Sequence, residues 1–174
     1  MNRLIQQLPQ AQDDDEFRQQ IALCVFLAVA MFEAFMNSYA LTLVRRPEYR
    51  SHAARINADL ASRRPLGRKL KTWPKALFSR PFGQGDAKAK MVTAVLDLRN
   101  RLMHFTPELE NLVFAGQHVP MINSEVFDSL REETAIEAAN TCYAAIEWLI
   151  RCHFKNESAA REQMHLWTVT IPRP

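Results

Sequence analysis

The 174-residue chain has little glycine and little cysteine. Four glycines argue against a protein built from many β-hairpins, because tight turns need residues that tolerate positive φ. The three cysteines, Cys24, Cys142 and Cys152, form neither a CxxC pair nor a metal-ligand spacing with histidine. We therefore expect free thiols in a reducing compartment and no structural zinc site.

The sequence also has no pattern typical of a signal peptide and no long uninterrupted apolar run. Residues 1–17 contain one arginine and a series of acids, without the apolar stretch of a signal peptide. Residues 21–44 are the most apolar, but their unbroken core spans only Ile21–Phe32, and Glu33 and Asn37 follow it. A bilayer span needs about 20 apolar residues. This stretch therefore predicts a buried core helix in a cytoplasmic protein without membrane contact; a membrane-associated helix is the alternative.

The small net charge of +3 hides a strong asymmetry along the chain. Residues 45–90 contain 13 basic and three acidic residues, a net charge of +10, whereas the remainder carries −7. A block this basic is typical of a surface that contacts phosphates. A solvated cationic face, or a surface that pairs with the acidic segments of a second copy, explains the same pattern.

Hydrophobic periodicity predicts one all-α domain of four or five helices, two of them long. The expected helices are residues 15–44, 53–63, 66–71, 87–104 and 125–154. We expect residues 1–14 to be a flexible N-terminal segment, residues 15–155 to form the bundle, and residues 156–174 to be a C-terminal tail. Residues 165–171 alternate in polarity, which predicts a short edge strand that pairs with residues 112–114.

Residues 98–105 contain the side chains that are the strongest candidates for a binding or catalytic role. On a helical wheel Met91, Val95, Leu98 and Leu102 share a core-facing sector that Val92, Leu96 and Met103 widen, and Arg99 falls inside the widened sector. A guanidinium in that position needs an anionic partner or an opening to a cleft. Asn100 and His104 lie one turn apart on one face, and Pro107 ends the helix close to the imidazole.

Two interpretations of these residues remain open at this stage. Arg99 can bind a phosphate while His104 moves protons and Asn100 orients one of them. Alternatively, His104 caps the helix end and Arg99 forms a buried ion pair with Glu33, the other isolated charge in an apolar context.

The pattern Arg99-Asn100-x-x-x-His104 resembles the signature of the HEPN superfamily (higher eukaryotes and prokaryotes nucleotide-binding). Three further segments resemble prokaryotic members of this superfamily: Phe32–Asn37, Leu70–Pro74 and His104–Glu108. The resemblance covers roughly residues 16–154. It implies an all-α bundle that dimerises so that two motifs face each other across one cleft.

Many members of this superfamily are metal-independent endoribonucleases, and others are inactive dimerisation or binding modules. The resemblance implies that His104 is the general acid or base, that Arg99 stabilises charge on the phosphorane and that Asn100 orients one of these groups. It also implies no cofactor, a homodimer, RNA as substrate and an antitoxin or other regulatory protein in stress or defence. For the RNA backbone we expect contacts from Arg101, Arg68, Lys69 and Lys71, together with Arg63 and Arg64, while Trp73 either stacks on a base or packs in the core.

Overall fold

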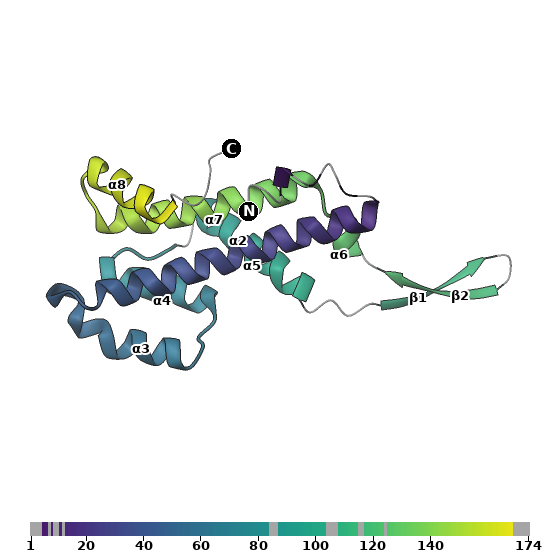
Figure 1. The fold of residues 1–174 in the computed structure, drawn as a ribbon. Helices are drawn as coiled ribbons and strands as arrows, with labels where there is room; N and C mark the ends of the chain where they lie inside the picture. The colour runs from purple at the N-terminus through teal and green to yellow at the C-terminus, as the bar shows by residue number, and fades with distance from the viewer. Residues whose placement is uncertain are drawn as a thin grey trace.

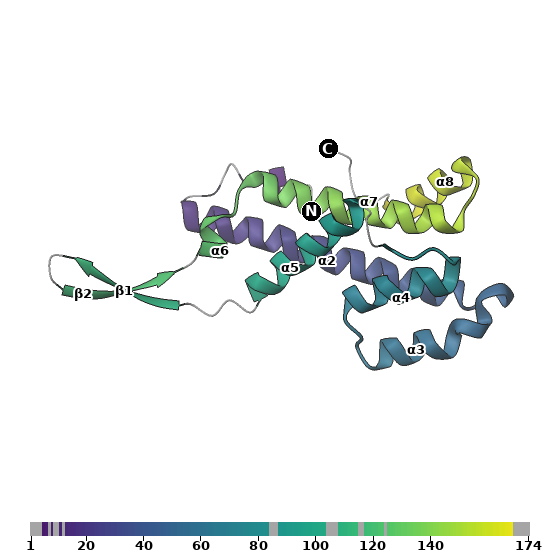
Figure 2. The same ribbon diagram turned by 180° about the vertical axis from the view of Figure 1, so that it is seen from behind.

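The computed structural model describes residues 5–6, 8, 11, 13–83, 87–103, 108–114, 117–123 and 125–168. The protein is mostly helical, and its centre consists of two long helices that run side by side, α2 (Asp14–Leu43) and α7 (Glu132–His153) (Figure 1). Helix α5 (Ala87–Met103) crosses α2 and contacts both long helices. Figure 2 shows this crossing from the opposite side, with α5 in front of α2.

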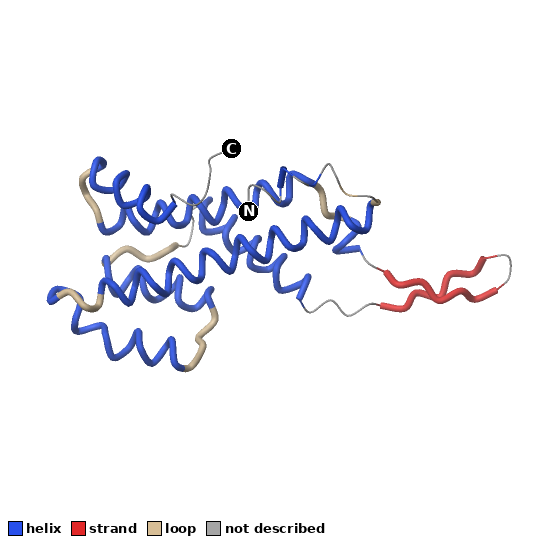
Figure 3. The backbone as a smooth tube through the Cα atoms, viewed as in Figure 1, coloured by secondary structure: helices blue, strands red, loops and turns tan. Residues whose placement is uncertain are grey.

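The remaining elements lie at the two ends of this core. The 3-10 helix η2 (Pro47–His52), α3 (Ala53–Ala61) and α4 (Leu66–Phe78) gather at the C-terminal end of α2. The short helix α6 (Glu125–Asp128) lies against the N-terminal half of α2. Strands β1 (Glu108–Phe114) and β2 (Gln117–Asn123) form an antiparallel hairpin that projects away from the helices (Figure 3).

Helix α2 confirms the predicted first helix. It begins where the aspartates predict it, because the Asp13 carboxylate accepts a hydrogen bond of 2.8 Å from the backbone N–H of Glu16. By length and composition α2 is apolar enough to cross a membrane, and half of its most apolar window is buried inside the protein. Helices in the cores of soluble proteins share these properties. Within the segment expected before α2, Leu8 is 1% exposed and packs in the core.

The predicted helix 125–154 is wrong near its start, because the chain bends between α6 and α7. Arg131 has an extended backbone, and its guanidinium donates to the carbonyl oxygens of Asp128 at 2.6 Å and Leu130 at 2.8 Å. Thr134 Oγ1 in turn accepts from the Arg131 N–H at 3.2 Å. These bonds supply partners for backbone carbonyl and N–H groups that the bend removes from helical hydrogen bonding. The bend also buries Leu130.

The predicted second short helix extends well beyond Lys71. Helix α4 continues through Pro74 to Phe78, where Ser79 ends it in a left-handed conformation. The buried series Leu66, Leu70, Trp73 and Leu77 explains the extension, since helical spacing keeps all four side chains in the core. This packing outweighs the hydrogen bond that Pro74 removes.

The predicted C-terminal strand is wrong over the residues described. Helix α8 (Glu157–Thr168) occupies most of the predicted tail and packs back on α7, burying Ala160 and Met164 one turn apart. Residues 112–114 pair instead with residues 117–119 of the hairpin. Residues 169–171 lie outside the described residues.

Candidate functional site

The predicted motif lies in the last turns of α5. Arg99 is half-buried, Asn100 is exposed, and His104 lies outside the described residues. The predicted core face of α5 is partly wrong, because Met91 and Met103 are 52% and 57% exposed. The face that packs on the bundle is instead centred near Val92, so Arg99 lies within it.

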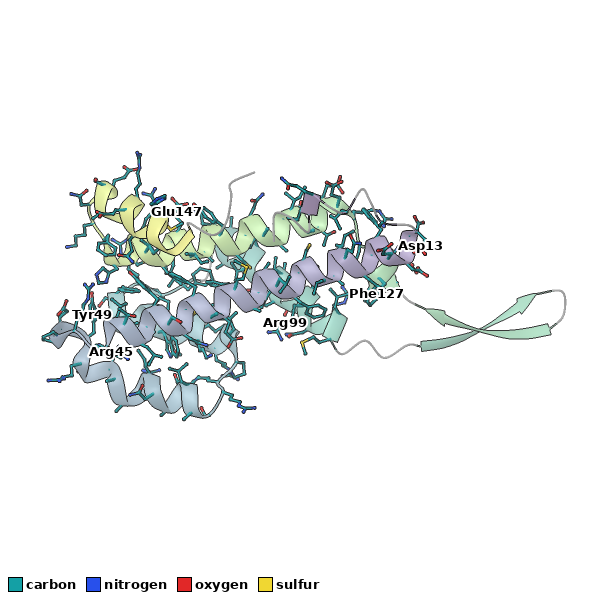
Figure 4. The ribbon with its side chains drawn as sticks, in the orientation of Figure 1. Asp13, Arg45, Tyr49, Arg99, Phe127 and Glu147 are labelled. Carbon is teal, nitrogen blue, oxygen red and sulfur yellow. The ribbon has the colours of Figure 1, made fainter. Side chains whose placement is uncertain are left out.

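The Arg99 guanidinium is partly removed from water, and none of the described side chains supplies an anion to balance it. Its Nε is buried and has no hydrogen-bond partner, and Nη1 donates only to the sulfur of Met103 at 3.4 Å. Figure 4 places Arg99 at the edge of the bundle where α5 crosses α2. A desolvated cation beside a weak sulfur acceptor costs free energy, and an anionic ligand would remove that cost.

The alternative ion pair between Arg99 and Glu33 is not formed. Glu33 Oε1 accepts from Lys69 Nζ at 2.8 Å, and no ion pair joins Arg99 to any of the side chains described. Lys69 Nζ also donates to Asn37 Oδ1 at 3.0 Å and lies 5.6 Å from the centre of the Trp73 ring. Glu33 is therefore paired with Lys69 of α4 and not with Arg99.

The expected basic contacts separate into exposed and buried groups. Arg68 and Lys71 on α4 and Arg101 on α5 are exposed, as an RNA contact requires. Lys69 is buried: its side chain is only 3% exposed, and its ammonium group is bonded to Glu33 and Asn37. The expected contact between Lys69 and RNA is therefore wrong. Arg101 follows Arg99 by two residues and therefore points to the opposite side of α5.

The beginning of α4 brings the basic segment to the motif helix. A Cβ built on Gly67 would lie 3.9 Å from Leu96 Cδ1 of α5, one turn before Arg99. Arg68 follows directly, on an exposed position. The first turn of α4 contains no acidic residue, so this helix end is positively polarised.

A second polar network fixes the position of α3 against α4. Trp73 is 1% exposed, and its Nε1 donates to Asp59 Oδ2 at 2.8 Å, which rules out base stacking as its role in this structure. Arg64 Nη1 donates to Asp59 Oδ1 at 2.7 Å. Burial disfavours the carboxylate, but the hydrogen bonds from Trp73 and Arg64 and the nearby arginines outweigh it and lower the pKa of Asp59.

Sequence reasoning missed an aromatic cluster around His153 at the end of α7. The imidazole Nε2 lies 3.3 Å from Arg46 Nη1, and Nδ1 lies 3.3 Å from the Tyr49 hydroxyl. Because arginine only donates, Nε2 accepts and Nδ1 carries the proton that goes to Tyr49. Burial, and then the charge of Arg46, lower the pKa of His153, while Glu48 opposes them. The contacts join residues about a hundred positions apart, so no local pattern could reveal them.

The other candidate positions offer little chemistry. The described residues include no group of three potential metal ligands. All three thiols are free, and burial raises the pKa of Cys142 to about 12, which makes this thiol unreactive. A small pocket beside α4 is apolar, with a lining of Met36, Tyr39, Ala40, Trp73, Pro74, Leu77, Phe78 and Leu149.

No protein-family model, curated protein or solved structure matches the chain. The geometry around Arg99 and the sequence of the motif are therefore the basis for a functional proposal.

Proposed function

We propose that this chain is a metal-independent endoribonuclease of the HEPN type, acting as a homodimer in the cytoplasm as a toxin or defence effector. The observation that carries the proposal is Arg99, a half-buried cation without an anionic partner among the described residues. It lies on the same helix as Asn100, five residues before His104. An arginine held in this way is suited to a phosphate, which accepts two parallel hydrogen bonds from a guanidinium.

The proposed reaction needs only groups that the RNA and these residues supply. The 2′-hydroxyl of RNA attacks the adjacent phosphorus, a new bond forms from the 2′-oxygen, and the bond to the 5′-oxygen breaks. His104 takes the proton of the 2′-hydroxyl and returns it to the departing 5′-oxygen, which gives the 5′-hydroxyl. Arg99 stabilises the charge that develops on the phosphorane, and Asn100 orients the phosphate or the imidazole. The products are a 2′,3′-cyclic phosphate and a 5′-hydroxyl.

Exposed cations support RNA as the substrate. Arg68 and Lys71 extend from α4, whose first turn lies against α5 one turn before Arg99. A backbone that enters along α4 would meet these charges before it reaches Arg99. Arg101 would contact an RNA strand on the other side of α5.

The alternative function is a non-catalytic dimerisation or binding module of the same superfamily. That alternative predicts Arg99 buried against Glu33, where it would have a structural role. Glu33 is paired with Lys69 instead, and Arg99 is left with the sulfur of Met103. An arginine at the motif without an ionic partner among the described residues favours the catalytic proposal.

The test is RNA cleavage in EDTA by the wild type and by the variants Arg99→Ala and His104→Ala. We expect the wild type to produce ends that resist a 3′-phosphatase until the cyclic phosphate is opened, and both variants to lose activity by at least a hundredfold. His165→Ala is the matched control, because His165 is exposed on α8. Equal cleavage by wild type and His104→Ala, or none by the wild type on diverse RNAs, would refute the proposal.

A further inference from the structure

The side chain that contacts the Arg99 guanidinium is a methionine open to solvent. Met103 lies one turn after Arg99, at the described end of α5, and is 57% exposed. Its sulfur accepts the 3.4 Å hydrogen bond from Arg99 Nη1. A thioether sulfur is a weak acceptor, so this bond does little to balance the charge of the guanidinium. Met103 thus combines contact with a cation and exposure to dissolved oxidants.

Three other methionines have only one of these properties or neither. Met36 and Met164 are buried, with exposed fractions of 3% and 6%. Met91 is 52% exposed on the same helix as Met103. It lies eight residues before Arg99, about 12 Å away along the helix axis, whereas the guanidinium extends toward Met103 on the other side. Helix α5 therefore contains a matched pair of exposed methionines, of which Met103 contacts Arg99.

We propose that Met103 is a modification site, where oxidation of its sulfur by a peroxide lowers the affinity of Arg99 for phosphate. The sulfur uses a lone pair to take one oxygen atom from hydrogen peroxide, so an S–O bond forms and the O–O bond breaks. The proton on the transferred oxygen passes to the departing hydroxide, which leaves as water. The sulfur loses two electrons, the peroxide gains them, and the product is methionine sulfoxide.

The hydrogen bond from Arg99 leaves the sulfur open to this reaction. A thioether sulfur has two lone pairs, and the single N–H donor engages one of them. More than half of the Met103 surface stays in contact with solvent, and hydrogen peroxide is small and uncharged. In the proposed homodimer, a cleft that admits an RNA strand also admits this molecule.

The oxygen of the sulfoxide changes what Arg99 can donate to. Oxidation turns an apolar thioether into a polar group, and its oxygen accepts hydrogen bonds far better than the sulfur does. The side chain of methionine rotates about three bonds, so the oxygen can turn toward a guanidinium one helical turn away. It then engages a donor that a phosphate would otherwise use. Because phosphate binds arginine best through two parallel N–H groups, the oxidised protein should bind phosphate more weakly.

Only the identity of the ligand in this inference rests on the proposed function. Oxidation of Met103 and the new bond to Arg99 do not require that the chain cleave RNA. The change is also reversible, because methionine sulfoxide reductases return the thioether. In that reaction two thiols are oxidised to a disulfide, and the sulfoxide oxygen leaves as water.

Peptide mass spectrometry after brief treatment with hydrogen peroxide tests the modification itself. We expect Met103 and Met91 each to gain one oxygen atom at similar rates, because both are exposed. Met36 and Met164 should react at least about tenfold more slowly, because the core excludes the oxidant. Oxidation of Met103 as slow as that of Met36 would overturn the proposal.

NMR of the arginine side chains tests the effect on Arg99 with inorganic phosphate as the probe. The Nε–H signal of Arg99, assigned by its loss in Arg99→Lys, should shift as phosphate is added. Oxidation should raise the phosphate concentration at half-saturation about tenfold in the wild type and in the control Met91→Leu. Met103→Leu should have the same half-saturation before and after peroxide. No change in the wild type, or equal changes in the two leucine variants, would overturn the proposal.

RNA with 2′-O-methyl groups shows whether the regulated ligand is the RNA backbone, because it lacks the 2′-hydroxyl that cleavage needs. In fluorescence anisotropy we expect oxidation to weaken binding of this RNA in the wild type and in Met91→Leu, but not in Met103→Leu. A methionine sulfoxide reductase should restore the affinity. If the phosphate response depends on Met103 but the RNA does not bind, the modification site stands with free phosphate as its ligand, and the ribonuclease proposal is refuted.

Discussion

Lys69 and Lys71 are two residues apart on α4, and the structure predicts opposite consequences for their replacement by methionine. The Lys69 side chain is 3% exposed and bonded to Glu33 and Asn37, whereas Lys71 is exposed to solvent. Methionine keeps most of the apolar stem of lysine and removes its charge. The comparison therefore isolates what each ammonium group does.

The expected loss for Lys69→Met follows from its contacts. Removing one member of a fully buried ion pair costs about 3–5 kcal/mol. Glu33 is one-third exposed, so water can solvate part of the carboxylate that is left, and we expect a loss of about 2–3 kcal/mol in the free energy of unfolding. Lys71→Met should change this free energy by less than about 0.5 kcal/mol, as surface substitutions do.

The double variant Glu33→Leu with Lys69→Met sharpens this prediction. It removes both charges together, so its destabilisation should be smaller than the sum of the two single losses by about 1–3 kcal/mol. Urea unfolding at pH 7 gives all four free energies of the cycle. RNA binding by fluorescence anisotropy supplies the second readout: Lys71→Met should weaken binding and lower the salt slope by about 1, and Lys69→Met should do neither.

The opposite pattern would refute the reasoning. If Lys69→Met unfolds at the wild-type urea concentration and loses RNA affinity, the ammonium group is available to RNA in solution. The pairing with Glu33 would then not hold α4 on α2.

Three further predictions concern the other polar groups. Arg99→Met should leave the urea midpoint unchanged or raise it, because it replaces a half-buried cation that has no anionic partner among the described residues; a loss above about 1 kcal/mol would contradict this. Because the folded state lowers the pKa of His153, wild-type stability should fall as the pH drops below about 6.5, and His153→Gln should remove this part of the pH dependence while His165→Gln should not. The folded state also lowers the pKa of Asp59, so Asp59→Asn should cost about 1–2 kcal/mol at pH 7 and progressively less below about pH 4, measured by thermal unfolding across that range.

The sequence predicted the elements whose signals are local. Aspartates at residues 13–15 predicted the start of α2, and the helical pattern after Asp86 predicted α5 nearly to its described end. Local signals failed where packing overrides them. The sequence predicted that this helix ends at Lys71, but Trp73 and Leu77 continue the buried face of α4 beyond it. The alternating polarity of residues 165–168 indicated a strand, but burial of Ala160 and Met164 favours a helix there.

The pairing of charges was the least predictable part of the site. Glu33 and Lys69 are 36 residues apart, so the choice between Lys69 and Arg99 as the partner of Glu33 depends on how α4 packs on α2. The same packing places Trp73 over the core and directs its N–H to Asp59, which carried no signal in the sequence. Charge composition identified a basic region, but it could not separate the exposed cations from the buried one.

This separation decides which cations are available for a ligand. Lys69 already has an acid, an amide oxygen and an aromatic face around its ammonium group, so binding a phosphate there would first require breaking a buried ion pair. Among the described residues, Arg99 donates only to the sulfur of Met103, and its Nε is buried without a partner. A phosphate at Arg99 would therefore gain a charge-assisted bond without that loss. Because Lys69 pairs with Glu33, this carboxylate is already engaged and does not neutralise Arg99.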